Sequence, residues 1–139
     1  MDVLIGSETG EHVLIRLLSG GDPNDYWWIS GEVSVAAGAF SGRFPANFRS
    51  PDFPPLREQL EMLYRQLEGT AAFATLEEQL ELQFVGDGLG HILIRGKARD
   101  LAGTGNRLAF ETEIDQTELP AIIAALRLVE IEYPVASRE

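Results

Sequence analysis

One helix-forming segment, residues 50–69, constrains the fold of this chain more than any other feature. Its apolar side chains recur at steps of three and four residues, which places them on one stripe of a helix. The stripe consists of Phe53, Leu56, Leu60, Leu63 and Leu67. Because the segments before and after it read as β-strands, the sequence predicts a helix laid on an antiparallel sheet. The stripe contains no reactive group, so it indicates a fold class and leaves the function open.

The ends of this segment carry residues with known capping chemistry. We expect Ser50 to accept hydrogen bonds from the first free amides of the helix. Gly69 is expected to end the helix in a left-handed conformation that costs glycine little. On the polar face, Arg57, Glu61 and Arg65 are spaced four residues apart, which favours ion pairs along the helix.

Strands are predicted on the N-terminal side of the helix. Short apolar runs occupy residues 3–5 and 13–18, and residues 26–37 and 39–49 alternate between apolar and polar side chains, as in a hairpin. The side chains expected on the apolar faces of this hairpin are Trp27, Ile29, Val33, Val35, Phe40, Phe44 and Phe48. Trp28 falls on the polar face, where a large aromatic is unexpected. Either another element covers it, or it anchors a partner.

A meander and a second helix are predicted after residue 69. Residues 70–75 form a short strand, and three alternating segments follow at 78–85, 91–100 and 107–114, the first two joined by a glycine-rich turn. The residues expected to point inward are Leu80, Leu82, Phe84, Ile92, Ile94, Ala98, Leu108, Phe110 and Ile114. Gln79 is expected outside, and the middle strand is basic on its outer face, so cross-strand charge pairs would set the register. Asp115 or Thr117 caps a final helix whose core side chains are Leu119, Ile122, Ile123 and Leu126.

These elements predict one domain over residues 1–139. The expected class is α+β, a mostly antiparallel sheet of hairpins and a meander with two packed amphipathic helices. No residue pattern repeats at a fixed period, and no low-complexity linker divides the chain. A chain of this length buries enough surface for a core without disulfides.

The composition limits the cellular compartment and the classes of partner that we expect. The chain has no cysteine, its first residues lack a basic region and a long apolar run, and no stretch reaches the length of a membrane span, so we expect a cytoplasmic protein. The formal net charge is −11. Such a surface repels nucleic acid and anionic membranes and attracts a basic protein partner.

Tests for reactive chemistry give no catalytic candidate. There is no cysteine nucleophile and no serine in a Gly-x-Ser-x-Gly turn. The two histidines, His12 and His91, stand apart and form no metal-binding motif. The neighbouring carboxylates Glu111 and Glu113 face basic side chains, which keeps them ionised and structural. We therefore expect no enzyme, no cofactor and no metal.

A series of motifs in this order resembles the WapI-type family of immunity proteins. The motifs are Trp-Ile-Ser-Gly-Glu-Val-Ser-Val at 28–35, Gly-Arg-Phe at 42–44, the leucine stripe with Glu-Gly-Thr-Ala at 68–71, Leu-Glu-Leu at 80–82, Gly-His-Ile at 90–92, Gly-Lys-Ala-Arg-Asp at 96–100 and Ile-Asp-Gln-Thr at 114–117. The resemblance implies a protein that binds and occludes a toxin domain delivered by a sibling bacterium. Many such domains are basic nucleases, and charge complementarity then makes a basic toxin domain the expected partner.

The resemblance supplies no contact residues, so the candidates come from charge and exposure alone. They are the partner-binding residues Trp28, Glu58, Glu61, Glu77, Glu78, Glu111 and Glu113. The competing interpretation is that each glutamate is simply solvated on a helix or strand face. Two other functions stay open: a scaffold that forms homo-oligomers through sheet edges or the Trp28 face, and a small-ligand-binding protein with a deep pocket near His12 or His91.

Overall fold

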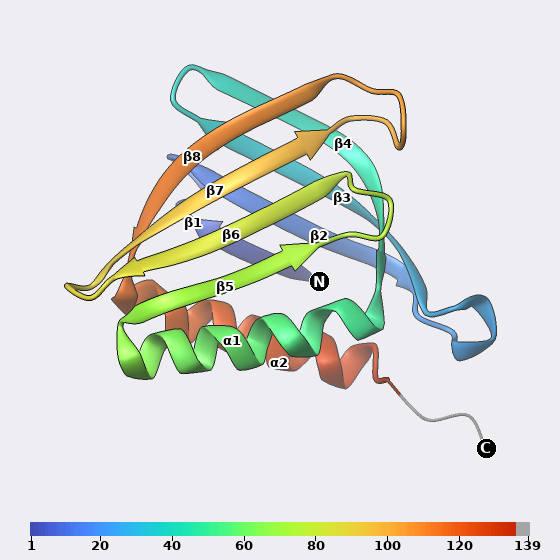
Figure 1. Cartoon of the computed structure of the whole chain (residues 1–139). Coiled ribbons are helices and arrows are strands. Elements are labelled where there is room, and N and C mark those ends of the chain that lie inside the picture. The colour runs from blue at the N-terminus through green and yellow to red at the C-terminus, as the bar shows by residue number, and fades with distance from the viewer. Residues whose placement is uncertain (136–139) are drawn as a thin grey trace.

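Two four-stranded antiparallel sheets and two helices make up residues 1–135, the part of the chain that the computed structural model describes (Figure 1). The first sheet contains β1 (Asp2–Gly6), β2 (His12–Gly20), β3 (Trp28–Ala37) and β4 (Phe40–Arg49). The second contains β5 (Glu68–Ala74), β6 (Leu80–Asp87), β7 (His91–Arg99) and β8 (Arg107–Asp115). Helix α1 (Phe53–Gln66) follows the first sheet and α2 (Leu119–Glu132) follows the second. The α+β class and its two helices are confirmed.

The second half of the chain repeats the architecture of the first. In each half, four strands follow one another as a meander, and a single 3-10 turn then leads into a helix. These turns are η2 (Ser50–Asp52) and η3 (Gln116–Glu118), and a further short turn, η1 (Pro23–Asp25), lies between β2 and β3. Both helices are 14 residues long and have proline in the first turn, where a missing amide is tolerated. The residues themselves show no such repeat.

The helices lie side by side and each lies along a strand of the opposite half (Figure 1). Helix α1 packs along β5 and α2 packs along β1. Phe53, at the start of α1, links the two sheets: its ring centroid lies 6.2 Å from that of Phe48 on β4 and 5.4 Å from that of Phe73 on β5. One continuous apolar core therefore joins both sheets and both helices.

The predicted alternation of the meander is confirmed with two exceptions. Its inward-facing residues are buried, apart from the half-buried Leu108. Gln79, expected outside, is only 4 % exposed. Its side-chain amide donates to the carbonyl oxygens of Pro45 at 3.1 Å and Arg99 at 3.4 Å, so it ties β4 to the end of β7. A buried amide with two partners is stable where an unpaired one would not be.

Two expectations for the first half are wrong. Trp27 precedes β3, is half-buried and has a positive φ of 60°, as does the neighbouring Tyr26 at 54°, because the chain turns there before the strand begins. Phe40 has the predicted parity but is 66 % exposed. It begins β4 at the tip of the hairpin, where the other sheet does not cover it. Trp28 opens β3 and is half-buried.

The ends of α1 also differ from expectation. Ser50 lies in the 3-10 turn, and its buried hydroxyl has no hydrogen-bond partner among residues 1–135. At the other end, Leu67 takes the left-handed conformation with a φ of 62° and its amide donates to the carbonyl of Leu63 at 2.7 Å. Gly69 belongs to β5. The cap predicted for the second helix belongs instead to the 3-10 turn before it: Asp115 accepts from the Thr117 amide at 2.9 Å in the capping box of η3, and α2 itself begins at Leu119.

Candidate functional site

The face of the second sheet that points away from the core, here called the outer face, is the candidate binding surface. Its central residues come from all four strands and are matched by the strand register. One row across the sheet is Ala72, Gln83, Arg95 and Glu111, and the next is Ala74, Glu81, Lys97 and Ala109. All of these are exposed except Glu81, which is half-buried. The outer face is therefore open to a partner.

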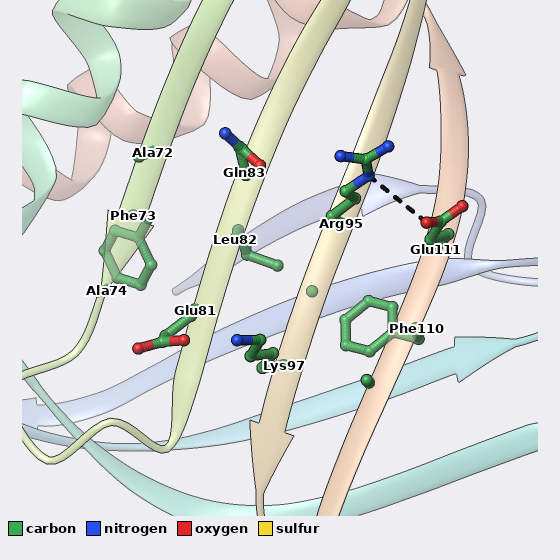
Figure 2. A pocket seen from close by; sticks show the side chains of 12 residues that line it. Ala72, Phe73, Ala74, Glu81, Leu82, Gln83, Arg95, Lys97, Phe110 and Glu111 are labelled. Atoms are coloured by element: carbon green, nitrogen blue, oxygen red, sulfur yellow. Dashed lines mark ion pairs between the residues drawn. The ribbon is translucent and has the colours of Figure 1, made fainter.

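A hollow of about 820 Å³ occupies the middle of the outer face (Figure 2). The short side chains of Ala72, Ala74 and Ala109 leave the backbone accessible at its floor, and charged side chains stand around them. Figure 2 shows Arg95 and Glu111 pointing toward each other across neighbouring strands, with the Arg95 Nε and a Glu111 carboxylate oxygen 3.5 Å apart. Both side chains are more than half exposed, so the pair adds little stability and is free to exchange for a partner's charges.

A second hollow, of about 390 Å³, continues the first toward the end of the sheet. It is lined by Glu78, Glu81, Lys97, Ala98, Arg99, Arg107, Leu108 and Ala109. Arg99 lies directly opposite Arg107 in the β7–β8 register. Within residues 1–135, neither of these arginines nor Lys97 has an ion pair. We call Lys97, Arg99 and Arg107 the basic cluster.

The opposite end of the outer face is acidic. Asp87 lies 2.9 Å from the Nδ1 atom of His91, and its other oxygen accepts from the amides of Leu89 at 2.7 Å and His91 at 3.1 Å. The Leu89 amide, followed by the bonds to His91, holds the pKa of Asp87 below its ordinary value. Asp87 in turn raises the pKa of His91. Glu113 and Asp115 lie on the adjacent strand, so the outer face runs from cationic at one end to anionic at the other.

The structure places some of the predicted partner-binding residues on this face and the others elsewhere. Glu111 lines the first hollow, Glu113 lies farther along the same strand, and Glu78 lines the second hollow. Glu77 lies beside Glu78 in the turn and accepts from the Asn47 side chain at 3.3 Å. The remaining candidates, Glu58 and Glu61 on α1 and Trp28 on β3, lie on other elements.

Glu61 has a structural partnership that the sequence did not indicate in full. Its carboxylate lies 3.2 Å from Arg57 on its own helix and 2.6 Å from Arg127 on α2. The Arg127 side chain is the main reason why the pKa of Glu61 is lowered. Arg57 also pairs with Glu130, so four charged side chains join the two helices. Glu61 therefore serves helix packing.

The basic cluster is the feature that sequence reasoning missed. Lys97 and Arg99 belong to the strand whose basic outer face is interpreted from the sequence as a register device, whereas Arg107 lies on the next strand. The signal that could have revealed the cluster is the Asp100–Asn106 stretch, a turn sequence that brings Arg99 and Arg107 opposite each other once the hairpin closes.

Other chemistry in the described residues is limited. His12 Nδ1 lies 3.0 Å from the Ser7 carbonyl and 2.9 Å from the Gly10 carbonyl, so this histidine closes the β1–β2 loop. Across residues 1–135, no three histidine, aspartate or glutamate side chains converge on a point that could hold a metal ion. Neither helix in this part of the chain is both long and apolar enough to span a bilayer.

Comparison with known proteins identifies a family. No curated protein matches the sequence. Among solved structures, the crystal structure of Trypanosoma brucei MRP1/MRP2 is similar with a TM-score of 0.47 and 9 % identity, covering 96 % of this chain and 85 % of that chain. The model of the Immunity protein WapI-like family matches residues 4–134, which takes in both sheets and both helices. The chain therefore belongs to the WapI-like immunity protein family.

Proposed function

We propose that this protein is a non-catalytic immunity protein that binds a cognate toxin domain and occludes it. The observation that carries the proposal is the family match over residues 4–134. An immunity protein acts by complementarity, so its binding surface needs exposed charge and shape rather than a nucleophile and a base.

The outer face of the second sheet has these properties. Its large hollow is shallow and exposed, and the Arg95–Glu111 pair at its centre is weak enough to be replaced by contacts to a partner. Charges of both signs are arranged in order along the face, which favours one docking orientation over others. The net charge of −11 adds long-range attraction to a basic toxin domain.

The scaffold alternative receives less support, because two sheet edges are blocked. The Ala72 amide on the edge strand β5 donates to the side chain of Gln59 at 3.0 Å. Pro45 stands in the other sheet's edge strand β4 and has no amide to offer. Capped amides and edge prolines are devices that prevent strand-to-strand association.

The test needs a cognate toxin domain, which is to be sought in the reading frames beside the gene for this protein. Co-expression of this protein should restore growth to cells that make the toxin domain. The two purified proteins should form a stoichiometric complex that weakens as salt rises from 50 to 300 mM. This weakening is expected because salt screens attraction between charges that lie farther apart than the Debye length, which is about 10 Å at 0.1 M. The complex should also block the toxin's activity in solution. Growth arrest in the presence of the protein, with no complex at either salt concentration, would reject the proposal.

The outer face is tested with a charge reversal and its matched control. Glu111→Lys places a positive charge at the hollow, whereas Glu8→Lys makes the same change in the exposed β1–β2 loop. We expect the first variant to weaken the toxin complex about tenfold or more and the second to leave it within about twofold. Equal effects would place the binding surface elsewhere.

A further inference from the structure

We propose that the basic cluster is a recognition site for a carboxylate-rich segment of a protein partner. The site is the second hollow, where Lys97, Arg99 and Arg107 project from two neighbouring strands. That the segment belongs to the toxin domain rests on the proposed function above.

The first argument is that these cations have no ion pair within the described part of a chain that is rich in carboxylates. The sequence has 22 acidic residues against 11 lysines and arginines. The paired arginines are Arg16, Arg43, Arg57, Arg95 and Arg127. The three residues of the basic cluster have no ion pair within residues 1–135, although Arg99 is half-buried. A like-charge pair directly across two strands is destabilising, so Arg99 opposite Arg107 costs stability in the free protein.

The second argument is that the fold holds Arg99 in place while the carboxylate next to it in the chain is engaged elsewhere. Asp100 follows Arg99 in the chain, yet its carboxylate accepts from the Asn106 amide at 2.7 Å and from the Asn106 side chain at 3.4 Å. This closes the hairpin and leaves Arg99 unneutralised. Gln79 fixes the backbone of Arg99 from the other side, since its carbonyl accepts the Arg99 amide at 2.9 Å and its side chain donates to the Arg99 carbonyl.

The third argument concerns the chemistry of the occupant. Guanidinium groups bind carboxylates and phosphates through paired, charge-assisted hydrogen bonds. A nucleic acid would bring a long run of phosphates against a protein of net charge −11, which repels it beyond the few neutralised contacts. A short acidic segment avoids this cost. Glu78 and Glu81 also line the hollow, and Glu81 lies opposite Lys97 in the β6–β7 register, so the two arginines are the groups that we expect to bind the carboxylates.

The charges at the two ends of the outer face also define the orientation of the bound segment. The opposite end of the outer face carries Asp87, Glu113 and Asp115, so a partner bound across the face meets carboxylates there. A segment that is acidic at the basic cluster and basic toward Glu113 fits both ends. This refines the expectation of a basic partner: its overall charge is positive, but the part seated in the second hollow is negative.

The test is a titration of the full-length protein, followed by its backbone amide NMR signals, with three short probes. An acetylated hexaglutamate peptide should shift the amides of Lys97, Arg99 and Arg107, a hexalysine peptide should leave them in place, and hexathymidylate should bind more weakly than hexaglutamate. Shifts spread over the surface, or stronger binding of hexathymidylate at the cluster, would overturn the proposal.

A double variant and a matched control make the test specific. R99Q/R107Q removes the facing charges and should lose about tenfold or more of the hexaglutamate affinity. R65Q removes an exposed arginine on α1 that also forms no ion pair with any residue from 1 to 135, and it should keep the wild-type affinity. Because the substitution relieves like-charge repulsion, the melting temperature of R99Q/R107Q should equal or exceed that of the wild type. Loss of binding by both variants, or by neither, would overturn the site.

The same variants separate this inference from the proposed function. In the toxin complex, R99Q/R107Q should lower the affinity about tenfold while R65Q does not. If the complex and the growth protection persist with unchanged affinity in R99Q/R107Q, the immunity function stands and the toxin does not use this site.

Discussion

Gly96 should tolerate no side chain, and substituting alanine should destabilise the fold by about 2 kcal/mol. Gly96 lies on β7 between Leu82 on β6 and Phe110 on β8. A Cβ atom built on it would come within 2.1 Å of the Phe110 Cζ atom and 2.6 Å of both Cε atoms. The Phe110 ring therefore lies against the glycine, and it must move if alanine is introduced.

Two routes of relaxation give a similar cost. If the ring shifts within the core, overpacking costs about 1–3 kcal/mol. If the ring leaves the core, the lost burial of a phenylalanine that is only 8 % exposed costs about 1.5–3 kcal/mol. The chain takes the cheaper route, so a loss of about 2 kcal/mol is expected and a loss above about 3 kcal/mol is not.

The assay is urea unfolding followed by far-UV circular dichroism, with Gly42→Ala as the matched control. Gly42 is a strand glycine on β4 with no heavy atom within 4 Å of an added Cβ. Its substitution should be neutral or stabilise by up to about 1 kcal/mol, because alanine loses less backbone entropy than glycine. In a Phe110→Val background, Gly96→Ala should cost less than about 0.5 kcal/mol. An undiminished cost in that background, or a Gly96→Ala variant as stable as the wild type, would refute the packing argument.

Three further perturbations test other features of the fold. A double-mutant cycle of Arg57→Ala and Glu130→Ala should show a coupling free energy of about 1 kcal/mol in urea unfolding, because this half-buried pair joins the two helices. A coupling free energy of zero would mean that the pair does not stabilise the fold. Asp115→Ala should cost about 1 kcal/mol by the same assay through loss of the capping box, and an unchanged midpoint would contradict that role. His91 has a pKa raised by Asp87, so its contribution to stability is present below its ordinary pKa of 6.5 and is lost as pH rises through the higher folded value. NMR titration should show that Asp87→Asn returns the His91 pKa toward its ordinary value, and an unmoved pKa would assign the shift to other carboxylates.

The sequence predicted what depends on local patterns. Strand parity identified the buried residues of the meander because one face of each strand packs on the core. Strand parity does not show where along a strand the neighbouring element stops covering it. The alternation therefore predicts Phe40 inside and Gln79 outside, whereas Phe40 is exposed and Gln79 is buried. The start of α1 was misplaced for a similar reason. Ser50 is a good capping residue by type, but the 3-10 turn before Phe53 takes its place.

The candidate site was harder to predict than the fold. Glu111 was identified from its position on an outward strand face, and it does line the first hollow. The basic cluster depends on Arg99 and Arg107 meeting across a hairpin and on Asp100 turning away into the loop. Neither the meeting of the two arginines nor the orientation of Asp100 can be predicted from residue types alone, because an aspartate next to an arginine in sequence is usually assumed to neutralise it.

The packing of each helix along a strand of the opposite half has a consequence during synthesis. When the first sheet and α1 have emerged from the ribosome, the strand that α1 packs along, β5, has not yet been made. β1, the first strand to appear, waits for α2, the last helix of the described chain. The contact between β1 and α2 joins the two ends of the described chain, and such long-range closure slows folding and leaves apolar surface uncovered until translation is nearly complete. A chain that ends before α2 would therefore leave β1 without the helix that packs along it.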